Sequence, residues 1–276
     1  MSKKTKHISR KRHYSRGKSL FFFVALISCL IFTVSCRVPT DESGSDNLVL
    51  GIPGPADTII DRPGYALGYI ELHEQPAWVI YRLTADEVTT KVASRSDDFK
   101  EDPDIPSGSA TLTDYKHSGY DRGHLAPAGD MSYSVQTMSD SFYMSNMSPQ
   151  KPNFNRQIWK KLESTVRKFA ITEKDVYIVT GPILPKTKTL TIGSNAVTVP
   201  DAFYKVVYDQ THPQKMIAFI VPNEGSSAPL QNFTVTVDMV EEMTGLDFFS
   251  EVPQPLQENL ESSIDINAWD WQRFPE

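Results

Sequence analysis

Apolar positions along the middle of the chain recur with the periods of regular secondary structure. Residues 66–72 and 77–83 are short runs rich in apolar, β-branched and aromatic side chains, and the polar segment HEQP separates them, which predicts a β-hairpin. Between residues 153 and 170 the apolar positions follow steps of three and four, which predicts an amphipathic helix. Pro152 and Asn153 are typical of a helix start. The apolar stripe of this helix consists of Ile158, Leu162, Val166 and Phe169.

Further strands follow this helix in the sequence. The segments DVYIVTGPIL, AVTVP, FYKVVY and MIAFIVPN have the composition of strands, and residues 236–246 then predict a short helix that begins near Thr236 or Asp238. Residues 95–120 are polar and punctuated by Pro, Gly and Ser, which predicts a long surface loop of the kind that is often functional. Strands, a helix and again strands favour one α+β domain over a regular βαβ alternation.

The first 36 residues differ from the rest of the chain. Residues 1–18 carry eight Lys or Arg and no acid, and the apolar run 19–36 follows them. A basic segment, an apolar segment and a small residue before a cysteine are typical of an export signal. The apolar run is also nearly long enough to span a bilayer as an uncleaved anchor, although Ser28, Thr33 and Ser35 weaken that alternative.

Both cysteines lie in this leader, so disulfides and thiolate metal sites are excluded from the rest of the chain. Cys36 follows Val34-Ser35, which resembles the lipobox of bacterial lipoproteins, and Cys29 fits that motif equally well but leaves a short apolar segment. The polar tether after Cys36 favours Cys36. We therefore expect a membrane-anchored lipoprotein that faces the periplasm or the cell exterior, with a secreted protein as the alternative. The chain divides into a leader (1–36), a polar tether (37–60), a globular domain (61–255) and a tail without an assigned role (256–276).

The charge of the chain is unevenly distributed. The whole chain has a formal charge of −6, but without the eight leader bases 20 bases face 34 acids, a net charge of −14. Such a balance is unfavourable for binding a polyanion, whose phosphates are contacted by Lys and Arg. Residues 111–171 carry eight bases and five acids and are therefore locally positive, at +3. A positive patch is compatible with fast, non-specific binding, although a solvated helix face explains these charges equally well.

The candidate chemistry lies between residues 120 and 163. Arg122 and His124 are two residues apart, so on an extended strand they face the same side, and a histidine beside a permanent cation is a reasonable general base. Asn155 and Glu163 are eight apart on the predicted helix and lie along one flank. An amide oxygen and a carboxylate are hard ligands suited to Mg²⁺, Mn²⁺ or Ca²⁺.

These residues belong to a longer pattern. DRGH at 121–124, followed by HLAPAGDM, SNMSPQ and NFNRQIWKKLE, resembles the DNA/RNA non-specific endonucleases of the ββα-metal (His-Me finger) class. The resemblance covers residues 65–255 and implies an α+β fold with a central, mostly antiparallel sheet flanked by helices. It implies hydrolysis of phosphodiester bonds in DNA and RNA to 5′-phosphate and 3′-hydroxyl ends. The other similar segments, in the family's order, are PAWVIYRLT, RSDDFKED, VYIVTGPIL, VPDAFYKVVY, AFIVPN and TGLDFF.

The resemblance also implies a role for each candidate residue. His124 is expected to be the general base that takes a proton from the attacking water. Asn155 is expected to be the sole direct protein ligand of one Mg²⁺, which Mn²⁺ can replace, and Glu163 to hold a metal-bound water. Arg122 and Arg95 are expected to bind the scissile phosphate and its developing charge.

Several residues have plainer alternatives. Asn146 is expected to position the histidine or the substrate, although a turn or cap role explains it as well. For Asp121 we favour a role in fixing the local backbone. Glu163 has an ordinary helix-surface acid as its alternative. His117 lies seven residues before His124, but a two-histidine metal site is disfavoured because the family uses a single histidine as a base.

Two competing functions remain open on the sequence. One is a surface lipoprotein that binds nucleic acid or another ligand without cutting it, which the presence of Arg122, His124, Asn155 and Glu163 disfavours. The other is a structure-selective phosphodiesterase. We see no base-reading element, so we expect DNA and RNA to be contacted through the phosphate backbone. The sequence assigns neither an inhibitor protein nor an oligomeric state.

Overall fold

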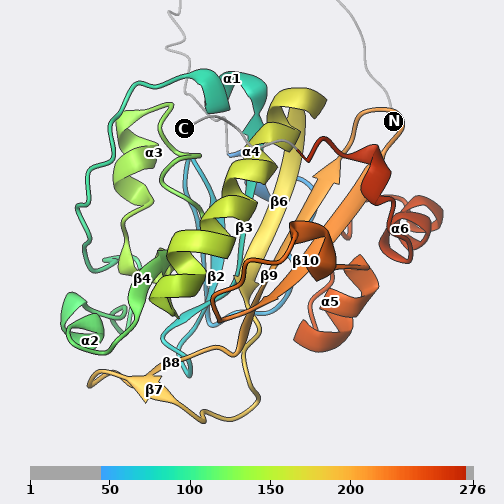
Figure 1. Ribbon diagram of the computed structural model, residues 1–276. Helices are drawn as coiled ribbons and strands as arrows, with labels where there is room; N and C mark the ends of the chain where they lie inside the picture. Colours follow the sequence, from blue (N-terminus) through green and yellow to red (C-terminus); the bar gives the residue numbers. More distant parts are fainter. Residues whose placement is uncertain (1–44, 272–276) are drawn as a thin grey trace, which may run out of the picture. The chain divides into compact units, whose positions relative to one another are not determined.

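A seven-stranded antiparallel sheet forms the centre of the computed structural model, which describes residues 45–271 (Figure 1). Its strand order is β1-β2-β3-β6-β9-β10-β11. The predicted hairpin is β2–β3, and three predicted strands are β6, β9 and β10, which confirms the α+β class. The expected leader and both cysteines lie outside the described residues. The strands are β1 (Thr58–Asp61), β2 (Ala66–Ile70), β3 (Gln75–Thr84), β6 (Asp175–Pro182), β9 (Ala202–Asp209), β10 (Lys215–Pro222) and β11 (Thr234–Val235).

Two short strand pairs and several helices surround this sheet. The pairs are β4 (Asp121–His124) with β5 (Met147–Gln150) and β7 (Thr191–Ile192) with β8 (Val197–Thr198). The α-helices are α1 (Ala85–Thr89), α2 (Leu112–Tyr115), α3 (Val135–Asp140), α4 (Lys160–Glu173), α5 (Val237–Thr244) and α6 (Gln254–Glu261). Five further helical segments are not α-helical. Four are 3-10 helices and η3 is a π-helix: η1 (Asp46–Leu48), η2 (Met144–Asn146), η3 (Phe154–Trp159), η4 (Leu230–Phe233) and η5 (Ile266–Ala268). Between residues 45 and 271, no helix combines the length and the apolar character needed to cross a bilayer.

Strands β2, β3, β6, β9 and β10 each contribute to two hydrophobic clusters, because successive side chains point to opposite faces of the sheet. In β3, Tyr81 packs in the cluster that contains Leu162 of α4. Its neighbour Ile80 packs in the second cluster, with Val240 of α5 and Leu260 of α6. Helix α4 therefore covers one face of the sheet, and α5 and α6 lie against the other (Figure 1).

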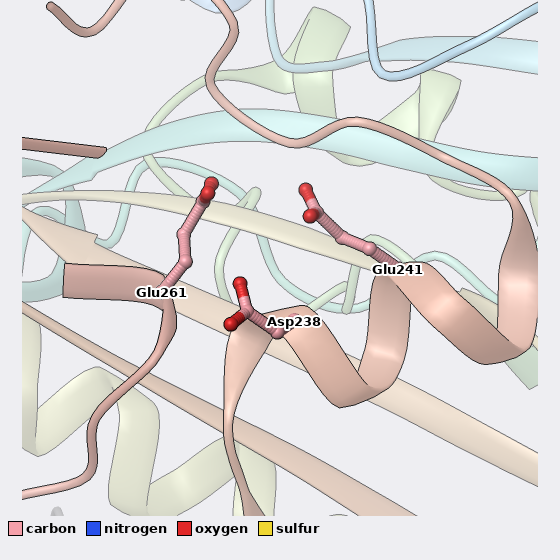
Figure 2. Close-up of side chains that lie close together, drawn as sticks. All are labelled: Asp238, Glu241 and Glu261. Carbon is pink, nitrogen blue, oxygen red and sulfur yellow. The ribbon is translucent and has the colours of Figure 1, made fainter. Parts of the chain in front are cut away.

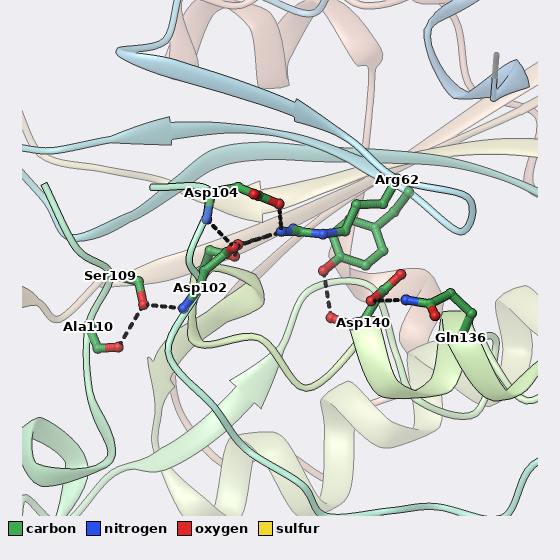
Figure 3. Close-up of polar contacts among 9 residues, drawn as sticks. Arg62, Asp102, Asp104, Ser109, Ala110, Gln136 and Asp140 are labelled. Carbon is green, nitrogen blue, oxygen red and sulfur yellow. Dashed lines mark hydrogen bonds and ion pairs between the residues drawn. The ribbon is translucent and has the colours of Figure 1, made fainter. Parts of the chain in front are cut away.

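The predicted surface loop over residues 95–120 is partly buried, because an ion pair holds its middle (Figure 3). The guanidinium of Arg62 donates two hydrogen bonds to Asp102, at 2.7 and 3.0 Å, and one to Asp104 at 2.7 Å. The side chains of Arg62 and Asp102 are only 7% and 0% exposed. Ser145, just before β5, also donates to the Asp102 carboxylate. These contacts fix the loop between the start of the sheet and the strand pair β4–β5.

Removing one partner of this buried pair is expected to destabilise the fold. Asp102→Ala leaves the Arg62 charge buried with only Asp104 beside it, and we expect a loss of about 3 kcal/mol in the free energy of unfolding, measured by urea denaturation. Asp104→Ala is the matched control, because the Asp104 side chain is 61% exposed. For that variant we expect a loss below about 1 kcal/mol. Equal losses in the two variants would show that burial of the pair is not what matters.

The chain beyond residue 255 continues to pack on the domain. Helix α6 crosses that boundary, and Trp269 is only 4% exposed, with its ring centroid 4.7 Å from that of Phe169 in α4. The Lys215 ammonium donates to the Ala268 carbonyl at 3.0 Å. Part of the tail to which the sequence assigned no role is therefore part of the core that supports α4. At the other end, η1 and most of β1 fall within the segment expected to be a tether.

Candidate active site

One pocket of about 680 Å³ brings together five of the six predicted site residues. Strand β4 supplies Arg122 and His124, the helical segment η3–α4 supplies Asn155 and Glu163, and the preceding loop supplies Arg95. We call this the central pocket. Asn146 does not line it. The strand pair followed by a helix is the local unit that holds the pocket together.

Gly123 leaves room for the side chain of Gln150 on the neighbouring strand. A Cβ atom at residue 123 would lie 2.0 Å from the Gln150 side chain, well inside van der Waals contact. Gly123 pairs with Ser148 in the antiparallel register, and His124 pairs with Met147. A larger residue at the motif glycine would therefore displace the buried Gln150 beside the strand that carries Arg122 and His124.

The imidazole of His124 is buried between aromatic rings. Its centroid is 4.8 Å from that of Phe142 in an edge-on arrangement and 5.6 Å from that of Phe99. Its Nε2 atom forms no hydrogen bond with any described residue. Burial, together with the positive charges of Arg95 and Arg122, lowers the pKa of His124 to about 3. The side chain is therefore neutral near pH 7, which is the form that accepts a proton.

The lowered pKa of His124 implies a specific dependence of stability on pH. Below pH 6.5, the ordinary value for histidine, the unfolded chain binds a proton at this residue and the folded chain does not. The contribution is fully present above pH 6.5 and is lost as the pH falls towards the folded value. We expect the stability difference between the wild type and His124→Ala to shrink by about 2 kcal/mol between pH 6.5 and pH 5, measured by urea unfolding. A difference that stays constant would contradict a buried neutral imidazole.

The amide of Asn155 has a fixed orientation. Its Nδ2 donates to Asp121 Oδ2 at 3.0 Å, which leaves its Oδ1 as the atom available to a cation. Arg156 donates to both oxygens of the same carboxylate, to Oδ2 at 2.8 Å and to Oδ1 at 2.6 Å. Burial acts to raise the pKa of Asp121, but the hydrogen bonds from Arg156 and Asn155 lower it overall. Asp121, for which the sequence favoured a backbone role, therefore contacts the candidate metal ligand directly.

Asp121→Ala is expected to weaken metal binding without removing the candidate ligand. The Asn155 amide loses the acceptor that fixes its orientation, and loss of such an outer partner lowers metal affinity by about 10- to 100-fold. Titration of the apoprotein with Mn²⁺ by calorimetry measures this change. Asp86→Ala removes the same charge from the exposed first turn of α1 and should leave the affinity unchanged. Unchanged affinity in Asp121→Ala would exclude the orienting role.

Asn155 and Glu163 both line the pocket because the helix begins with a π turn. In a regular α-helix, residues eight apart overshoot two turns of about 3.6 residues each. The π turn η3 is wider, since its hydrogen bonds span five residues, and it takes up part of that overshoot. Trp159, midway between them in the sequence, does not line the pocket and is fully buried against Phe154 and Phe203.

The half-buried Glu163 lies in a field of buried charges. Burial raises its pKa, and the positive charges of Arg167 and Lys205 oppose that shift. Arg167 also donates to Asp130 at 2.8 Å, and Asp130 accepts from the Tyr81 hydroxyl at 2.9 Å. Lys205, on strand β9, is fully buried and its ammonium has no hydrogen-bond partner among the described residues. This network was not predicted, and its one signal in the sequence is the lysine inside the apolar run FYKVVY.

Two guanidinium groups lie over the aromatic rings that flank His124. The Arg122 guanidinium carbon lies 4.1 Å from the centroid of Phe99, and that of Arg95 lies 5.0 Å from the centroid of Phe142. Arg95 also forms an ion pair with Asp97 at 2.7 Å. Both arginines remain exposed to solvent and line the central pocket, so they are free to contact a phosphate group.

Asn146 is fully buried and braces the backbone that follows His124. Its Oδ1 accepts from the Ala126 amide at 2.9 Å, and its Nδ2 donates to the carbonyls of Ala126 and Ser141 at 3.0 and 2.8 Å. Its hydrogen-bonding groups are thus engaged with the protein. This geometry fits a role in positioning the histidine and does not fit direct contact with a substrate.

The lining of the central pocket has a strong positive balance. The only acid that lines it is Glu163. The local positive charge of residues 111–171 therefore lies partly in this pocket, although the chain as a whole is acidic. The six basic residues that line the pocket are Lys91, Arg95, Arg122, Arg156, Lys160 and Arg167.

A second group of acids lies on the opposite face of the sheet (Figure 2). The carboxylates of Asp238 and Glu241 in α5 and of Glu261 in α6 approach within 4.8 Å of one another. Two of them have protein partners, because Glu241 accepts from the Phe248 amide and Glu261 from the Gln257 amide. The group shares no residue with the central pocket, so it does not supply ligands to the metal expected there.

Comparison with known proteins finds one family throughout. The model of the family described as DNA/RNA non-specific endonuclease matches residues 43–255. The chain is 39% identical over 221 residues to nuclease C1 of Cunninghamella echinulata var. echinulata, which covers 74% of this chain and 88% of that relative. It is 36% identical over 226 residues to the mitochondrial nuclease of Saccharomyces cerevisiae, which covers 74% and 69%.

A solved structure extends this similarity to the fold. The crystal structure of the EndoG/EndoGI complex contains a chain that is 36% identical to this one, and the two chains superpose with a TM-score of 0.71. The match covers 76% of this chain and 92% of that chain. At this level of identity the sheet with its flanking helices is the fold of that nuclease, which confirms the fold predicted from the DRGH resemblance.

The comparisons contradict the predicted location. The sequence predicted an exported lipoprotein anchored in a membrane, but the relatives from yeast, mouse and human are named as mitochondrial nucleases. The prediction rested on the basic and apolar segments before residue 37, which lie outside the described residues. It was wrong because a basic, acid-free N-terminal segment is also common in targeting peptides of other compartments.

Proposed function

The chain belongs to the DNA/RNA non-specific endonuclease family, and on that premise we propose that its central pocket hydrolyses phosphodiester bonds of DNA and RNA with one divalent metal ion and His124 as the general base. The chain is a nuclease, and nucleases of this family depend on a divalent metal. The observation that carries the proposal is the joint lining of one basic pocket by Arg95, Arg122, His124, Asn155 and Glu163.

His124 takes the proton of the attacking water in this proposal. Its buried Nε2 has no partner among the described residues, and its lowered pKa keeps the ring neutral near pH 7. A positioned base of this kind contributes about 10²- to 10⁴-fold to the rate. Asn146 supports it by holding the backbone of the next two residues in place.

Asn155 and Glu163 fit a divalent cation. Asp121 binds the Asn155 Nδ2, so the Oδ1 is left to act as a hard oxygen ligand, and Glu163 supplies a carboxylate in the same pocket. Mg²⁺ suits so few protein ligands because it keeps most of its waters, and Mn²⁺ is the alternative. A bound ion supplies a positive charge that stabilises the phosphorane and the leaving 3′ oxygen.

Arg122 and Arg95 bind the phosphate that is cut. Their guanidinium groups flank the histidine and are held by aromatic rings rather than by buried acids, apart from the exposed ion pair of Arg95 with Asp97. Guanidinium groups match the geometry of phosphate oxygens and stabilise the charge that develops on them. When water attacks the phosphorus and the 3′ oxygen leaves, the products carry 5′-phosphate and 3′-hydroxyl ends.

The test is cleavage of supercoiled plasmid and of total RNA by the purified chain with Mg²⁺, with Mn²⁺ or with EDTA. We expect metal-dependent loss of both substrates, complete inhibition by EDTA, and 5′-phosphate ends that a phosphatase can remove. Because phosphate contacts bind the substrate, the rate should fall with added salt. Binding of nucleic acid without cutting under all of these conditions would instead favour the binding-protein alternative.

A further inference from the structure

A second pocket, of about 550 Å³, opens beside the central pocket. The two pockets share four lining residues, namely Arg95, Arg122, Asn155 and Arg156. We call this second space the side pocket. Because a nucleic-acid strand continues on both sides of any phosphate that is cut, a strand whose phosphate lies at Arg122 and Asn155 must place an adjacent nucleotide near the side pocket.

The side pocket differs from the central pocket in chemistry. Its own walls are Phe99, Leu112, Tyr115 and Tyr120, with Lys116 at the edge. Leu112 is 44% exposed, so its side chain is accessible to a ligand in this pocket. Aromatic and aliphatic walls beside a phosphate-binding centre are the surface on which a base stacks.

The acids of the side pocket do not repel a polyanion. Asp97 is paired with Arg95 at 2.7 Å and Asp121 with Arg156 at 2.6 Å. Lys116 is exposed and forms no ion pair with a described residue. The net charge presented at the rim is therefore positive, which fits a nucleotide and disfavours a basic peptide or a purely apolar ligand.

The side pocket also contains an unused polar atom. Tyr115 is 5% exposed, and its buried hydroxyl has no hydrogen-bond partner among the described residues. Burial and the negative charge of Asp114 raise the pKa of Tyr115, and the nearby charge of Arg122 opposes that shift. A buried polar group without a partner is costly, and the protein itself does not satisfy this one.

We propose that the side pocket binds one nucleobase, that of the nucleotide next to the phosphate held at Arg122 and Asn155. Leu112 and Tyr120 contact the face of this base. This inference rests on the proposed function, because it takes the central pocket as the place of the phosphate. With this pocket the cleavage rate depends on the presence of a base on one side of the cut bond. The pocket does not distinguish ribose from deoxyribose.

The experiment uses single-stranded DNA oligonucleotides that carry one abasic tetrahydrofuran nucleotide at a defined position. Cleavage at every bond is resolved on a sequencing gel for the wild-type chain with Mg²⁺. We expect the bond on one side of the abasic position to be cut about tenfold more slowly than in the normal oligonucleotide, and the bond on the other side to be cut at the normal rate. Equal rates at both bonds would overturn the proposal.

Variants assign this discrimination to the side pocket. Tyr120→Ala and Leu112→Ala should each bring the ratio of normal to abasic cleavage close to one, whereas Tyr120→Phe should keep it because the ring remains. Met243→Ala removes an exposed apolar side chain from α5, on the opposite face of the sheet, and should keep the full ratio. A ratio that survives both alanine variants would place the base elsewhere and overturn the assignment.

Failure of the proposed function is distinguished by a binding measurement in EDTA. Fluorescence anisotropy of labelled octanucleotides compares a normal strand with one in which every base is absent. In one outcome the chain cuts neither strand and still binds the normal strand about tenfold more tightly, with Tyr120→Ala removing this difference. That result supports base binding in the side pocket and excludes the nuclease mechanism. If cutting is normal and neither assay distinguishes normal from abasic strands, base binding in the side pocket is excluded and the nuclease mechanism is supported.

Discussion

His124→Ala is expected to lower kcat/KM for plasmid and RNA cleavage by about 10²- to 10⁴-fold, the range that a positioned general base contributes. The neutral imidazole lies between Phe99 and Phe142, and alanine at this position removes the proton acceptor and leaves a space of about its size. Added imidazole should therefore restore part of the rate. Metal affinity should be unchanged, because the histidine acts as a base and not as a ligand.

His117→Ala is the matched control for this variant. It removes a histidine seven residues earlier that does not line the central pocket, so it should cut normally. A large loss of metal affinity in either variant would revive the two-histidine metal site that the sequence disfavoured. Near-normal cutting by His124→Ala would show that His124 is not the general base, whether or not the metal affinity changes.

The local parts of the site were predictable from the sequence, because each depends on residues close together along the chain. Arg122 and His124 share a short strand, and the three- and four-residue apolar steps gave the helix that carries Asn155 and Glu163. Strands β2, β3, β6, β9 and β10 were predictable in the same way, because they are apolar runs bounded by turn residues, whereas the short strands β1 and β11 were not predicted. The order of the strands was not predicted, because no pattern within a strand shows which strand it pairs with.

What the sequence could not give are contacts between distant charges. Asp121 and Asn155 are 34 residues apart, and Arg62 and Asp102 are 40 apart, so no periodicity connects them. A carboxylate in a turn motif is equally suited to bonding its own backbone, which is why Asp121 was given a backbone role. The π turn before α4 was also unforeseen, because a single extra residue per turn does not disturb an apolar stripe enough to be recognised.

The burial of Lys205 was also not predictable from the sequence. A lysine in the run FYKVVY alternates with apolar neighbours and so suggests one solvent-facing position on a strand. In the structure α4 covers that face of the sheet, and the ammonium lies beneath the pocket near Glu163. The strand pattern records the alternation of side chains but not what covers each face.

Asn155→Ala is expected to lower the affinity for Mn²⁺ by more than about 100-fold, which exceeds the loss expected for an outer partner such as Asp121. The reason is that the Asn155 Oδ1 is the oriented oxygen of the pocket, with its Nδ2 held by Asp121 at 3.0 Å. Calorimetric titration of the apoprotein measures the affinity directly, apart from any activity. Asn153→Ala is the matched control, because this exposed asparagine lies two residues earlier on the same segment and outside the pocket.

Exchanging the two side chains tests the orienting contact as well as the ligand. Asn155→Asp alone places a carboxylate against that of Asp121, and like charges at this distance repel, so affinity should stay low. The double variant Asp121→Asn, Asn155→Asp restores one amide and one carboxylate with their positions reversed, and it keeps an oxygen available to the cation. We expect it to recover at least about tenfold of the affinity lost in Asn155→Asp. Recovery would show that the pair acts as a unit, whereas no recovery would restrict the role to the asparagine oxygen at position 155.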